Sequence, residues 1–429
     1  MKKSKFIKST IILIIGGFLT KILGMFIKIV MTRLLGTKGI GTYMLISPTF
    51  TLLIGLASLG MPVAISKLVA EDKRNNKNLV FSSIPIVMII NIFIMSILIF
   101  ISPFIAEKLL NEPKTYYALL AIGMVLPFIS ISSILRGYFF GKEKMIPHVV
   151  SNITEDLVRL IILSIGIPFF LKRGLEYAMA FIVLSNIASE LTSILILFFF
   201  LPKNFKITKK DLKPVKNNIK EIMNIGLPTT GSRLIGSIGY FLEPIILTFS
   251  LLKIGLTNEQ IVTEYGIING YIMPLLLLPS FFTMAISQAL IPTVSHAYAN
   301  GHITYTKNKI KQAIFFSLLI GLPVTIFFEL FPTIPLKLIY NTTEGINYLR
   351  IIAPICLFYY IQSPVTSALQ AMGKAKEAML GTLEGMVIRT ISLLIGCLTC
   401  GIWGLIIATS LNMIYVTIHQ IHHIKKSLQ

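Results

Sequence analysis

The chain alternates between long apolar runs and short polar segments from one end to the other. A membrane-spanning α-helix needs about 20 predominantly apolar residues, which sets the length to look for. The pattern predicts an all-α polytopic membrane protein with twelve transmembrane helices, near residues 9–35, 41–66, 79–105, 116–139, 149–171, 177–201, 222–252, 265–295, 311–331, 347–371, 378–399 and 401–421.

Composition agrees with this prediction. Hydrophobic residues make up 54% of the 429 residues and charged residues only 13%, and mean hydropathy is +0.80. A soluble domain has about 25% charged residues. The first apolar run follows Met1–Lys8 and is too long, and too closely followed by another, for a cleaved signal peptide. We expect it to remain as the first helix.

The net charge of +21 is explained by membrane topology. Of the lysines and arginines that flank the predicted helices, 25, Arg136 among them, fall on one side. Only nine fall on the other: Arg33, Lys38, Lys108, Lys114, Lys172, Arg173, Lys253, Lys337 and Arg350. The positive-inside rule then places both termini in the cytoplasm. We expect a monomer in the bacterial cytoplasmic membrane, and no nucleic-acid partner is needed to account for the charge.

A basic polar segment divides the chain into two halves. We predict an N-terminal six-helix lobe at 1–201, a cytoplasmic linker at 202–221 and a C-terminal six-helix lobe at 222–429. Three short motifs recur in the same order in both halves: "TKILG" (Thr20–Gly24) with "SRLIG" (Ser232–Gly236), "MPVAISKLVAE" (Met61–Glu71) with "IPTVSHAYAN" (Ile291–Asn300), and "LRGYFFGKEK" (Leu135–Lys144) with "LQAMGKAK" (Leu369–Lys376).

Repeats of six helices share one orientation in the membrane, so an axis along the membrane normal relates them. Transporters built this way hold substrate near the bilayer midplane at the interface of the repeats. We therefore expect a central cavity lined by the first, second, seventh and eighth predicted helices.

Charged residues inside the predicted helices are the candidate substrate-binding residues. Lys21 matches Arg233 in the repeat, and each lies near the middle of its helix, where a charge costs about 3 kcal/mol. Lys28 lies seven residues after Lys21, on the same helix face and about 10 Å along the axis. A long side chain can also reach the membrane surface or pair with a buried acid. Lys21 is too deep to reach either surface, so we predict that Lys21, Lys28, Arg233 and Glu243 line a shared polar cavity.

Other charges within the helices are interpreted as structural. Glu155 and Arg159 are four residues apart, a spacing that permits a salt bridge on one helix. Glu384 and Arg389 have a similar place in the eleventh helix at a poorer spacing. Two acids stand alone in the sequence and are candidate proton or cation sites: Glu190 and Glu329.

Prolines mark the second and eighth helices. Each proline removes one backbone hydrogen bond, and in lipid the freed carbonyl needs another partner. The candidate gating or kink residues are Pro48, Pro62, Pro274 and Pro292, with static bends as the alternative. Cys397 and Cys400 form a CxxC without a second pair, which favours two buried small hydrophobic side chains over a metal site.

These motifs resemble a known family. "MTRLLGTKGIGTYMLISPTF", "LGMPVAISKLVAE" and "LRGYFFGKEK" are similar to the polysaccharide-transporter branch of the MOP flippase superfamily, which includes lipid II flippases. The resemblance implies two six-helix lobes around a cationic cavity that opens to each side in turn, and polyprenyl-pyrophosphate-linked sugars as substrates. In lipid II flippases an arginine stands where this chain has Lys21. Two further arginines of that family fall on Ile27 and near Leu52. We also expect no counterpart of their extra helix pair.

The leading hypothesis is a flippase for a polyprenyl-pyrophosphate-linked oligosaccharide, whose pyrophosphate needs basic partners. Its partners are this lipid-linked sugar and membrane lipids. The alternative is a multidrug or organic-cation exporter, which should line its cavity with acids. An enzyme is disfavoured because neither paired carboxylates nor metal-ligand spacings occur. We expect no catalytic residue, no metal and no cofactor, with a monovalent cation, a proton or the membrane potential as the driving force.

Overall fold

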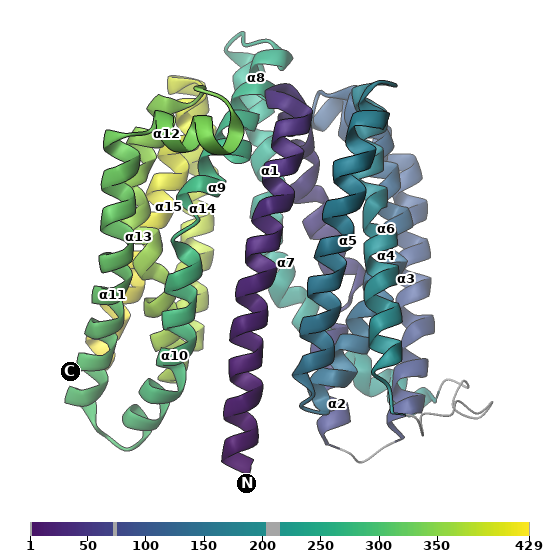
Figure 1. Ribbon diagram of the computed structural model, residues 1–429, viewed down its shortest axis with the longest axis vertical. Helices are drawn as coiled ribbons and strands as arrows, with labels where there is room; N and C mark the ends of the chain where they lie inside the picture. The colour runs from purple at the N-terminus through teal and green to yellow at the C-terminus, as the bar shows by residue number, and fades with distance from the viewer. Residues whose placement is uncertain (1, 72–74, 203–214, 429) are drawn as a thin grey trace. The chain divides into compact units, whose positions relative to one another are not determined.

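The computed structural model describes residues 2–71, 75–202 and 215–428, without the side chains of 2–11, 14, 232 and 235. These residues form helices joined by short turns, and no strand occurs among them (Figure 1). The all-α prediction is confirmed. Most of the predicted linker, residues 203–214, lies outside the described residues.

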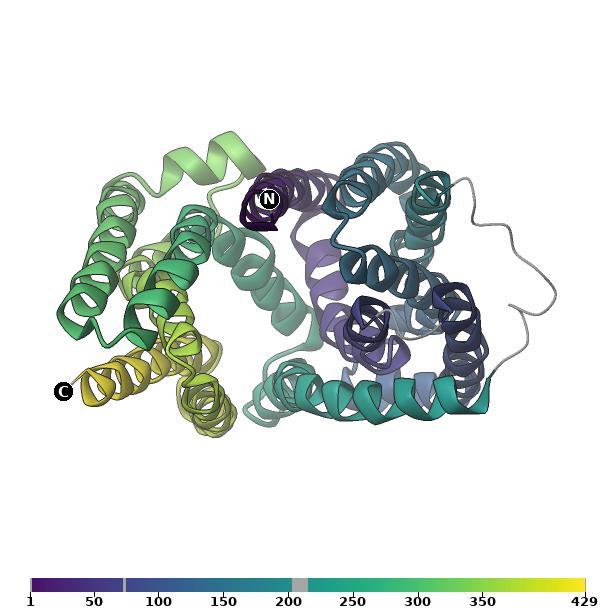
Figure 2. The ribbon, with the colours of Figure 1, turned by 90° about the horizontal axis from the view of Figure 1, so that it is seen from below.

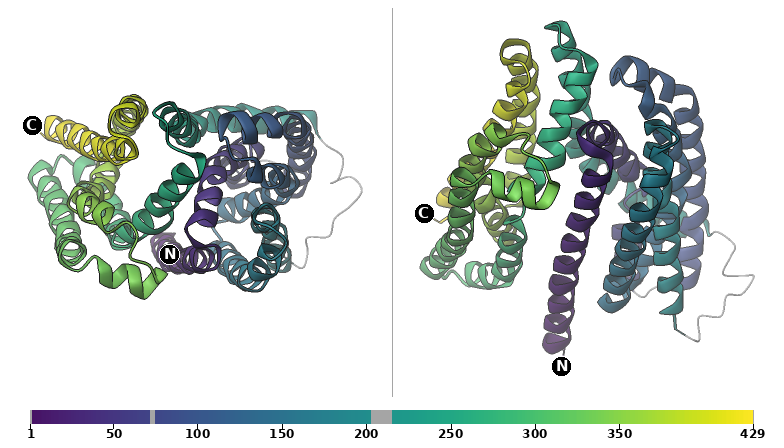
Figure 3. Two further views of the ribbon diagram at one scale, coloured as in Figure 1. Left: turned by 90° about the horizontal axis from the view of Figure 1, so that it is seen from above. Right: turned by 45° about the horizontal axis from the view of Figure 1, so that its top comes forward.

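The first half of the chain contains six long α-helical elements and a shorter one. They are α1 (Lys2–Ala57), α2 (Met61–Ala70), α3 (Asn76–Phe104), α4 (Tyr116–Gly141), α5 (Met145–Leu171), α6 (Leu175–Phe199) and α7 (Lys216–Lys253). The first two predicted helices merge in α1, but Gly36, at φ +68° and ψ −177°, separates them with a non-helical conformation that glycine readily adopts. The segment before Gly36 is a long single rod (Figure 3).

The second half continues with shorter pieces and five helices of 20 residues or more. They are α8 (Asn258–Gly266), the π-helical turn η3 (Ile267–Ile272), α9 (Met273–Leu276), α10 (Ser280–Ala299), α11 (Ile303–Leu330), α12 (Thr333–Pro335), α13 (Ile346–Ala371), α14 (Ala375–Cys400) and α15 (Trp403–Ser427). The predicted eighth helix thus begins earlier than expected and is interrupted before α10. Thr257 caps α8, because its hydroxyl accepts from the Gln260 backbone N–H while the Gln260 side chain accepts from the Thr257 N–H.

Each of the twelve predicted ranges falls on helical structure. By length and composition, eight described helices can cross a membrane, and two bent pairs can each make one further span. The first of the eight, Ile15–Ala70, includes the break at Gly36 and so covers two predicted helices. The remaining predicted helix is α5, which carries three charged residues, Glu155, Asp156 and Arg159. The protein is therefore a multi-pass membrane protein.

Contacts between helices divide the chain into two compact units, residues 1–241 and 242–429, so the boundary lies inside α7. In the first unit α2 to α6 pack side by side, as the view along the helices in Figure 2 shows. The core there contains Met61, Ile65, Phe139 and Leu197, together with Ile222 from the start of α7. The N-terminal part of α7 therefore belongs to the first unit.

Candidate functional site

Three helices of the first unit bring charges together in their interior. Arg136 of α4 donates from Nη2 to Oε2 of Glu155 on α5 at 2.5 Å. The same Nη2 lies 3.6 Å from Oε2 of Glu190 on α6 and donates to the Ser193 hydroxyl at 3.0 Å. The Arg136 side chain is only 21% exposed. Arg136 is thus the centre of an interior ion network, and its assignment to the basic flank of a membrane helix is corrected.

A second arginine completes this network. Arg159 donates to Oε1 of Glu155 at 2.6 Å and lies 3.7 Å from Oδ1 of Asp156. The predicted salt bridge between Glu155 and Arg159 is confirmed. Glu190 is not solitary, because the Ser132 hydroxyl donates to its Oε2 at 2.5 Å in addition to the nearby Arg136.

One signal in the sequence points to this network. Ser185, Ser189 and Ser193 recur every fourth residue along α6, and all three are buried on one side of that helix. Small polar residues on one face of a membrane helix form hydrogen bonds with neighbouring helices. Two partners of Arg136, Glu155 and Ser193, lie 19 and 57 residues away in the chain, so the sequence does not show that they meet.

In the second unit Glu243 is held by an ion pair. Its Oε2 contacts Nη2 of Arg389 on α14, and its Oε1 accepts a hydrogen bond from the Tyr265 hydroxyl at 3.1 Å. Glu243 is 3% exposed. Arg389 also donates to the Thr409 hydroxyl at 3.4 Å. The carboxylate that the sequence predicts for substrate binding is therefore already paired with an arginine.

Glu384 and Arg389 have different partners. Glu384 accepts a hydrogen bond from the Tyr415 hydroxyl at 2.7 Å, and Nε2 of His419 lies 3.3 Å from the same carboxylate. Glu384 and Arg389 therefore do not pair with each other, and each has a different structural partner.

The three predicted cavity cations differ from these residues because they have no acidic partner among the described side chains. Lys21 on α1 and Arg233 on α7 are exposed, and Lys28 is half-buried. Lys21 and Arg233 both belong to the first unit. The unpaired charges deep in the predicted helices are therefore positive. Glu329, an exposed acid, lies one residue before the end of α11.

The predicted second helix is broken at residues 58–60, between α1 and α2. Leu59 and Gly60 both have positive φ there, 45° and 59°. The Ser130 hydroxyl of α4 donates to the carbonyl of Ala57, the last residue of α1, at 3.0 Å. The Asn91 amide of α3 in turn donates to Ser130 at 2.9 Å. Neighbouring helices thus satisfy a carbonyl that the break removes from the helix.

A helix from the first unit also packs against this break. A side-chain carbon on Gly60 would lie 2.9 Å from the Gly226 carbonyl and 2.9 Å from Cβ of Thr229, both on α7. Gly60 therefore serves two purposes, since it takes the positive φ and permits the close approach of α7.

The predicted eighth helix has a break of its own at residues 277–279. The segments before and after it, Asn258–Leu276 and Ser280–Ala299, are bent by 50°. The Tyr360 hydroxyl of α13 donates to the carbonyl of Leu276, the last residue of α9, at 2.6 Å. Because α4 and α13 are the fourth and tenth predicted helices, equivalent helices of the repeat supply the donor at both breaks.

The four candidate kink prolines occupy two kinds of position. Pro62 is the second residue of α2, where a missing backbone N–H costs no helical hydrogen bond. Pro274 lies inside the continuous helical segment Asn258–Leu276, just before the break at residues 277–279. Pro48 and Pro292 lie inside α1 and α10, away from the two breaks. A gating role for any of the four stays a prediction.

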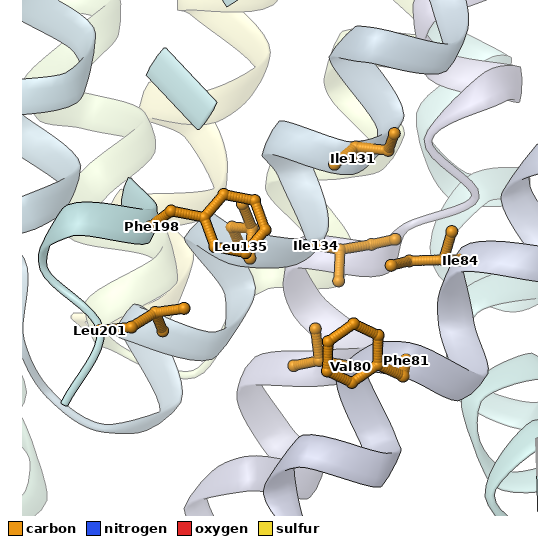
Figure 4. Close-up of a pocket in the computed structure, with 8 residues that line it drawn as sticks. All are labelled: Val80, Phe81, Ile84, Ile131, Ile134, Leu135, Phe198 and Leu201. Atoms are coloured by element: carbon orange, nitrogen blue, oxygen red, sulfur yellow. The ribbon is translucent and has the colours of Figure 1, made fainter. Parts of the chain in front are cut away.

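A small apolar cavity lies in the first unit. Figure 4 shows its lining, which comes from α3, α4 and the end of α6: Val80, Phe81, Ile84, Ile131, Ile134, Leu135, Phe198 and Leu201. Its volume is about 20 Å³ and its walls are almost entirely apolar. A space of this size holds about one water molecule, which needs polar partners that this cavity lacks. It is a packing gap rather than a ligand site.

The cysteines do not form a metal site with other residues. Among the described residues, no group of three or more His, Cys, Asp or Glu side chains is placed to hold a metal ion. Cys356 and Cys397 are buried, whereas Cys400 is exposed. The prediction of a buried side chain is therefore wrong for Cys400.

Comparison with known sequences places this architecture in a family. The family described as "Polysaccharide biosynthesis protein" matches residues 6–298. This chain belongs to that family. It lies in the polysaccharide-transporter branch of the MOP flippase superfamily, and residues 237–395 also match the MatE family.

Individual members of the superfamily are similar over nearly the whole chain. Stage V sporulation protein B from Bacillus subtilis (strain 168) is 37% identical over 97% of this chain and 83% of its own length. Lipid II flippase MurJ from the same organism is 22% identical over 90% of this chain and 76% of its own. Among solved structures, an inward-facing multidrug resistance MATE family transporter of the MOP superfamily superposes with a TM-score of 0.76 at 17% identity, covering 95% of each chain. At that identity the likeness shows the fold alone.

Proposed function

We propose that this protein is a flippase that moves a polyprenyl-pyrophosphate-linked oligosaccharide, a precursor of cell-wall or surface polysaccharide, across the bacterial cytoplasmic membrane by alternating access. It is a transporter and not an enzyme. Its relatives include a lipid II flippase, and its family is named for polysaccharide biosynthesis. The polyprenyl tail stays in the bilayer while only the headgroup crosses.

One observation carries this proposal: Lys21 and Arg233, two charged side chains inside the predicted helices that have no ion-pair partner among the described residues, are both positive. Glu155, Glu190 and Glu243 each lie against an arginine. Lys21 and Arg233 have no such partner among the described residues and are exposed. An unpaired cation in a membrane helix is expensive, so it indicates a functional role. A pyrophosphate offers the strong charge-assisted hydrogen bonds that these heads lack.

The alternative is a multidrug or organic-cation exporter, which the MatE match and the structural likeness to multidrug transporters support at the level of family and fold. Such a protein needs unpaired acids deep in its helices. Glu155, Glu190 and Glu243 instead lie against arginines, and Glu384 contacts Tyr415 and His419, which favours an anionic substrate.

The proposal includes no metal and no cofactor. A gradient of a monovalent cation or proton, or the membrane potential, drives the step. With both termini in the cytoplasm, the headgroup enters from the cytoplasmic side. The protein acts as a monomer and does not bind nucleic acid.

Transport of two chemically opposite substrates tests the proposal. The purified protein is reconstituted in proteoliposomes, and translocation of a fluorescent polyprenyl-pyrophosphate sugar is compared with that of a lipophilic organic cation. We expect movement of the first and none of the second above protein-free vesicles. Transport of the cation with no movement of the lipid-linked sugar would establish the exporter instead.

A further inference from the structure

A groove with a basic rim lies at one end of the second unit, apart from the residues discussed so far. Its volume is about 410 Å³, within the range of small-molecule sites. Four residues of α11, three of α15 and the residue that follows α15 line it: Lys307, Ile310, Lys311, Ile314, Ile421, Ile424, Lys425 and Leu428. The groove therefore combines three lysines with five aliphatic side chains and contains no acid.

The packing of three helices creates this groove. Both α11 and α15 pack extensively on α13, but they make little contact with one another. Figure 1 shows the C-terminal end of α15, in yellow, near the start of α11. Ile310 and Ile424 belong to a core cluster that also contains Leu369 of α13 and Met372, which follows α13. The floor of the groove is therefore part of an apolar core.

The lysines are arranged for one kind of ligand. Lys307 and Lys311 are one helical turn apart on α11, so their side chains extend from the same face, and Lys425 faces them from α15. All three are exposed. Because they lie at the ends of two membrane-spanning helices, their ammonium groups are at the level of lipid headgroups, while the isoleucines below them are at the level of the acyl chains.

We propose that this groove binds an anionic phospholipid of the surrounding leaflet, with the phosphate between the three lysines and the first acyl carbons on the isoleucine floor. Basic pockets between transmembrane helices select anionic headgroups by this arrangement. A free phosphate ion would use only the lysines and leave the apolar floor exposed to water. A zwitterionic lipid adds a positive choline that the three lysines repel. The site is independent of Lys21 and Arg233 and of the transported substrate.

Lipid binding to the purified full-length protein in detergent tests this inference. Native mass spectrometry measures the apparent Kd for phosphatidylglycerol and phosphatidylcholine. The pocket variant is Lys307→Gln with Lys311→Gln and Lys425→Gln. The control variant, Lys309→Gln with Lys376→Gln and Lys426→Gln, removes the same charge from residues outside the groove. A lysine near an anionic lipid contributes about fivefold in binding, so the pocket variant should bind phosphatidylglycerol on the order of 100-fold more weakly. The control should stay near wild type.

A second variant tests the groove itself without changing charge. Ile314→Trp fills the apolar part and should weaken phosphatidylglycerol binding about tenfold or more, with the thermal unfolding temperature recorded to show that the protein is folded. Phosphatidylcholine binding should be equal in all variants, and millimolar inorganic phosphate should not displace the lipid. The proposal would be overturned if the pocket and control variants lost phosphatidylglycerol binding equally, or if inorganic phosphate alone displaced the lipid. Wild-type phosphatidylglycerol binding in the pocket variant would do the same.

Discussion

At the scale of single residues, the interior charges divide into paired and unpaired groups. Arg136 contacts two carboxylates from two other helices, and Arg159 shares one of them. Removing one member of a buried ion pair leaves a charge without compensation, which costs more than the pair contributes. The ion network is therefore expected to matter for stability, and Lys21 and Arg233 for transport.

The first prediction concerns Arg136. Arg136→Leu should lower the free energy of unfolding by about 3–5 kcal/mol, because Glu190 loses its nearest cation and Glu155 keeps only Arg159. The triple variant with Glu155→Gln and Glu190→Gln should recover much of this loss, since no uncompensated carboxylate remains. Thermal unfolding in detergent measures the stability of the single and the triple variant. Lys144→Leu, which replaces an exposed lysine, is the control. An Arg136→Leu protein as stable as wild type would show that the network does not hold α4, α5 and α6 together.

The second prediction decides between two roles for Glu243. Its contacts with Arg389 and Tyr265 favour a structural one. Glu243→Gln alone and Arg389→Gln alone should each destabilise the protein by about 3–5 kcal/mol. The double variant should be close to wild type in stability and should still transport. A stable double variant that has lost transport would instead make Glu243 a substrate-binding residue.

At the scale of elements, the predicted second and eighth helices are both broken, at residues 58–60 and 277–279. Each break frees a carbonyl at the end of the preceding segment, and a side chain from the equivalent helix of the repeat donates to it. A carbonyl without a partner in the membrane interior is costly, so these donors stabilise the breaks as permanent features.

The third prediction follows from these donors. Ser130→Ala leaves the Ala57 carbonyl unpaired, which costs about 1–3 kcal/mol and should speed amide hydrogen exchange at residues 57–61 about tenfold or more. Tyr360→Phe removes the matching donor in the second unit and keeps the ring. Ser133→Ala is the control, because the Ser133 hydroxyl bonds only within its own helix. Unchanged exchange in both Ser130→Ala and Tyr360→Phe would mean that the breaks do not depend on these hydrogen bonds.

The elements themselves were largely predictable. A run of apolar residues long enough to cross the membrane is a strong and local signal, and all twelve predicted ranges fall on helices. The break at Gly60 was harder to predict from the sequence, since it depends on the approach of Gly226 from a distant helix. The partners of Arg136 could not be predicted from the sequence either. Its contacts lie on α5 and α6, and only the fourfold spacing of serines on α6 indicates a polar face.

At the scale of the whole molecule, the distribution of lysine and arginine sets the orientation. Moving Arg136 from the flanking residues to the interior network changes the majority side only from 25 to 24 residues, against nine. The positive-inside rule therefore still predicts cytoplasmic termini.

The fourth prediction tests this orientation by labelling with a membrane-impermeant maleimide. Cys400→Ser removes the exposed native cysteine, and Cys356 and Cys397 are buried. In that background Lys172→Cys should react in intact cells, because it lies at the end of α5 on the predicted outer side. Lys144→Cys, at the start of α5, should react only after permeabilisation. The reverse labelling pattern would invert the topology.

The central claim is that Lys21 and Arg233 hold the pyrophosphate of the substrate while the headgroup crosses. A charge-assisted contact with phosphate contributes about 1.5–3 kcal/mol, so losing one should weaken headgroup binding about tenfold or more. Lys21 and Arg233 make no ion pair with other described residues, so replacing them should leave the amount of folded protein unchanged or higher.

The rate at which a fluorescent polyprenyl-pyrophosphate sugar is flipped in proteoliposomes tests this claim directly. The protein level is determined in the same vesicles. Lys21→Ala and Arg233→Ala should each reduce the rate about tenfold or more at limiting substrate, and Lys21→Arg should retain most of it. Lys172→Ala, which removes an exposed cation at a helix end, should flip at the wild-type rate. Wild-type flipping by both Lys21→Ala and Arg233→Ala would contradict the account and leave Lys21 and Arg233 without a role in transport.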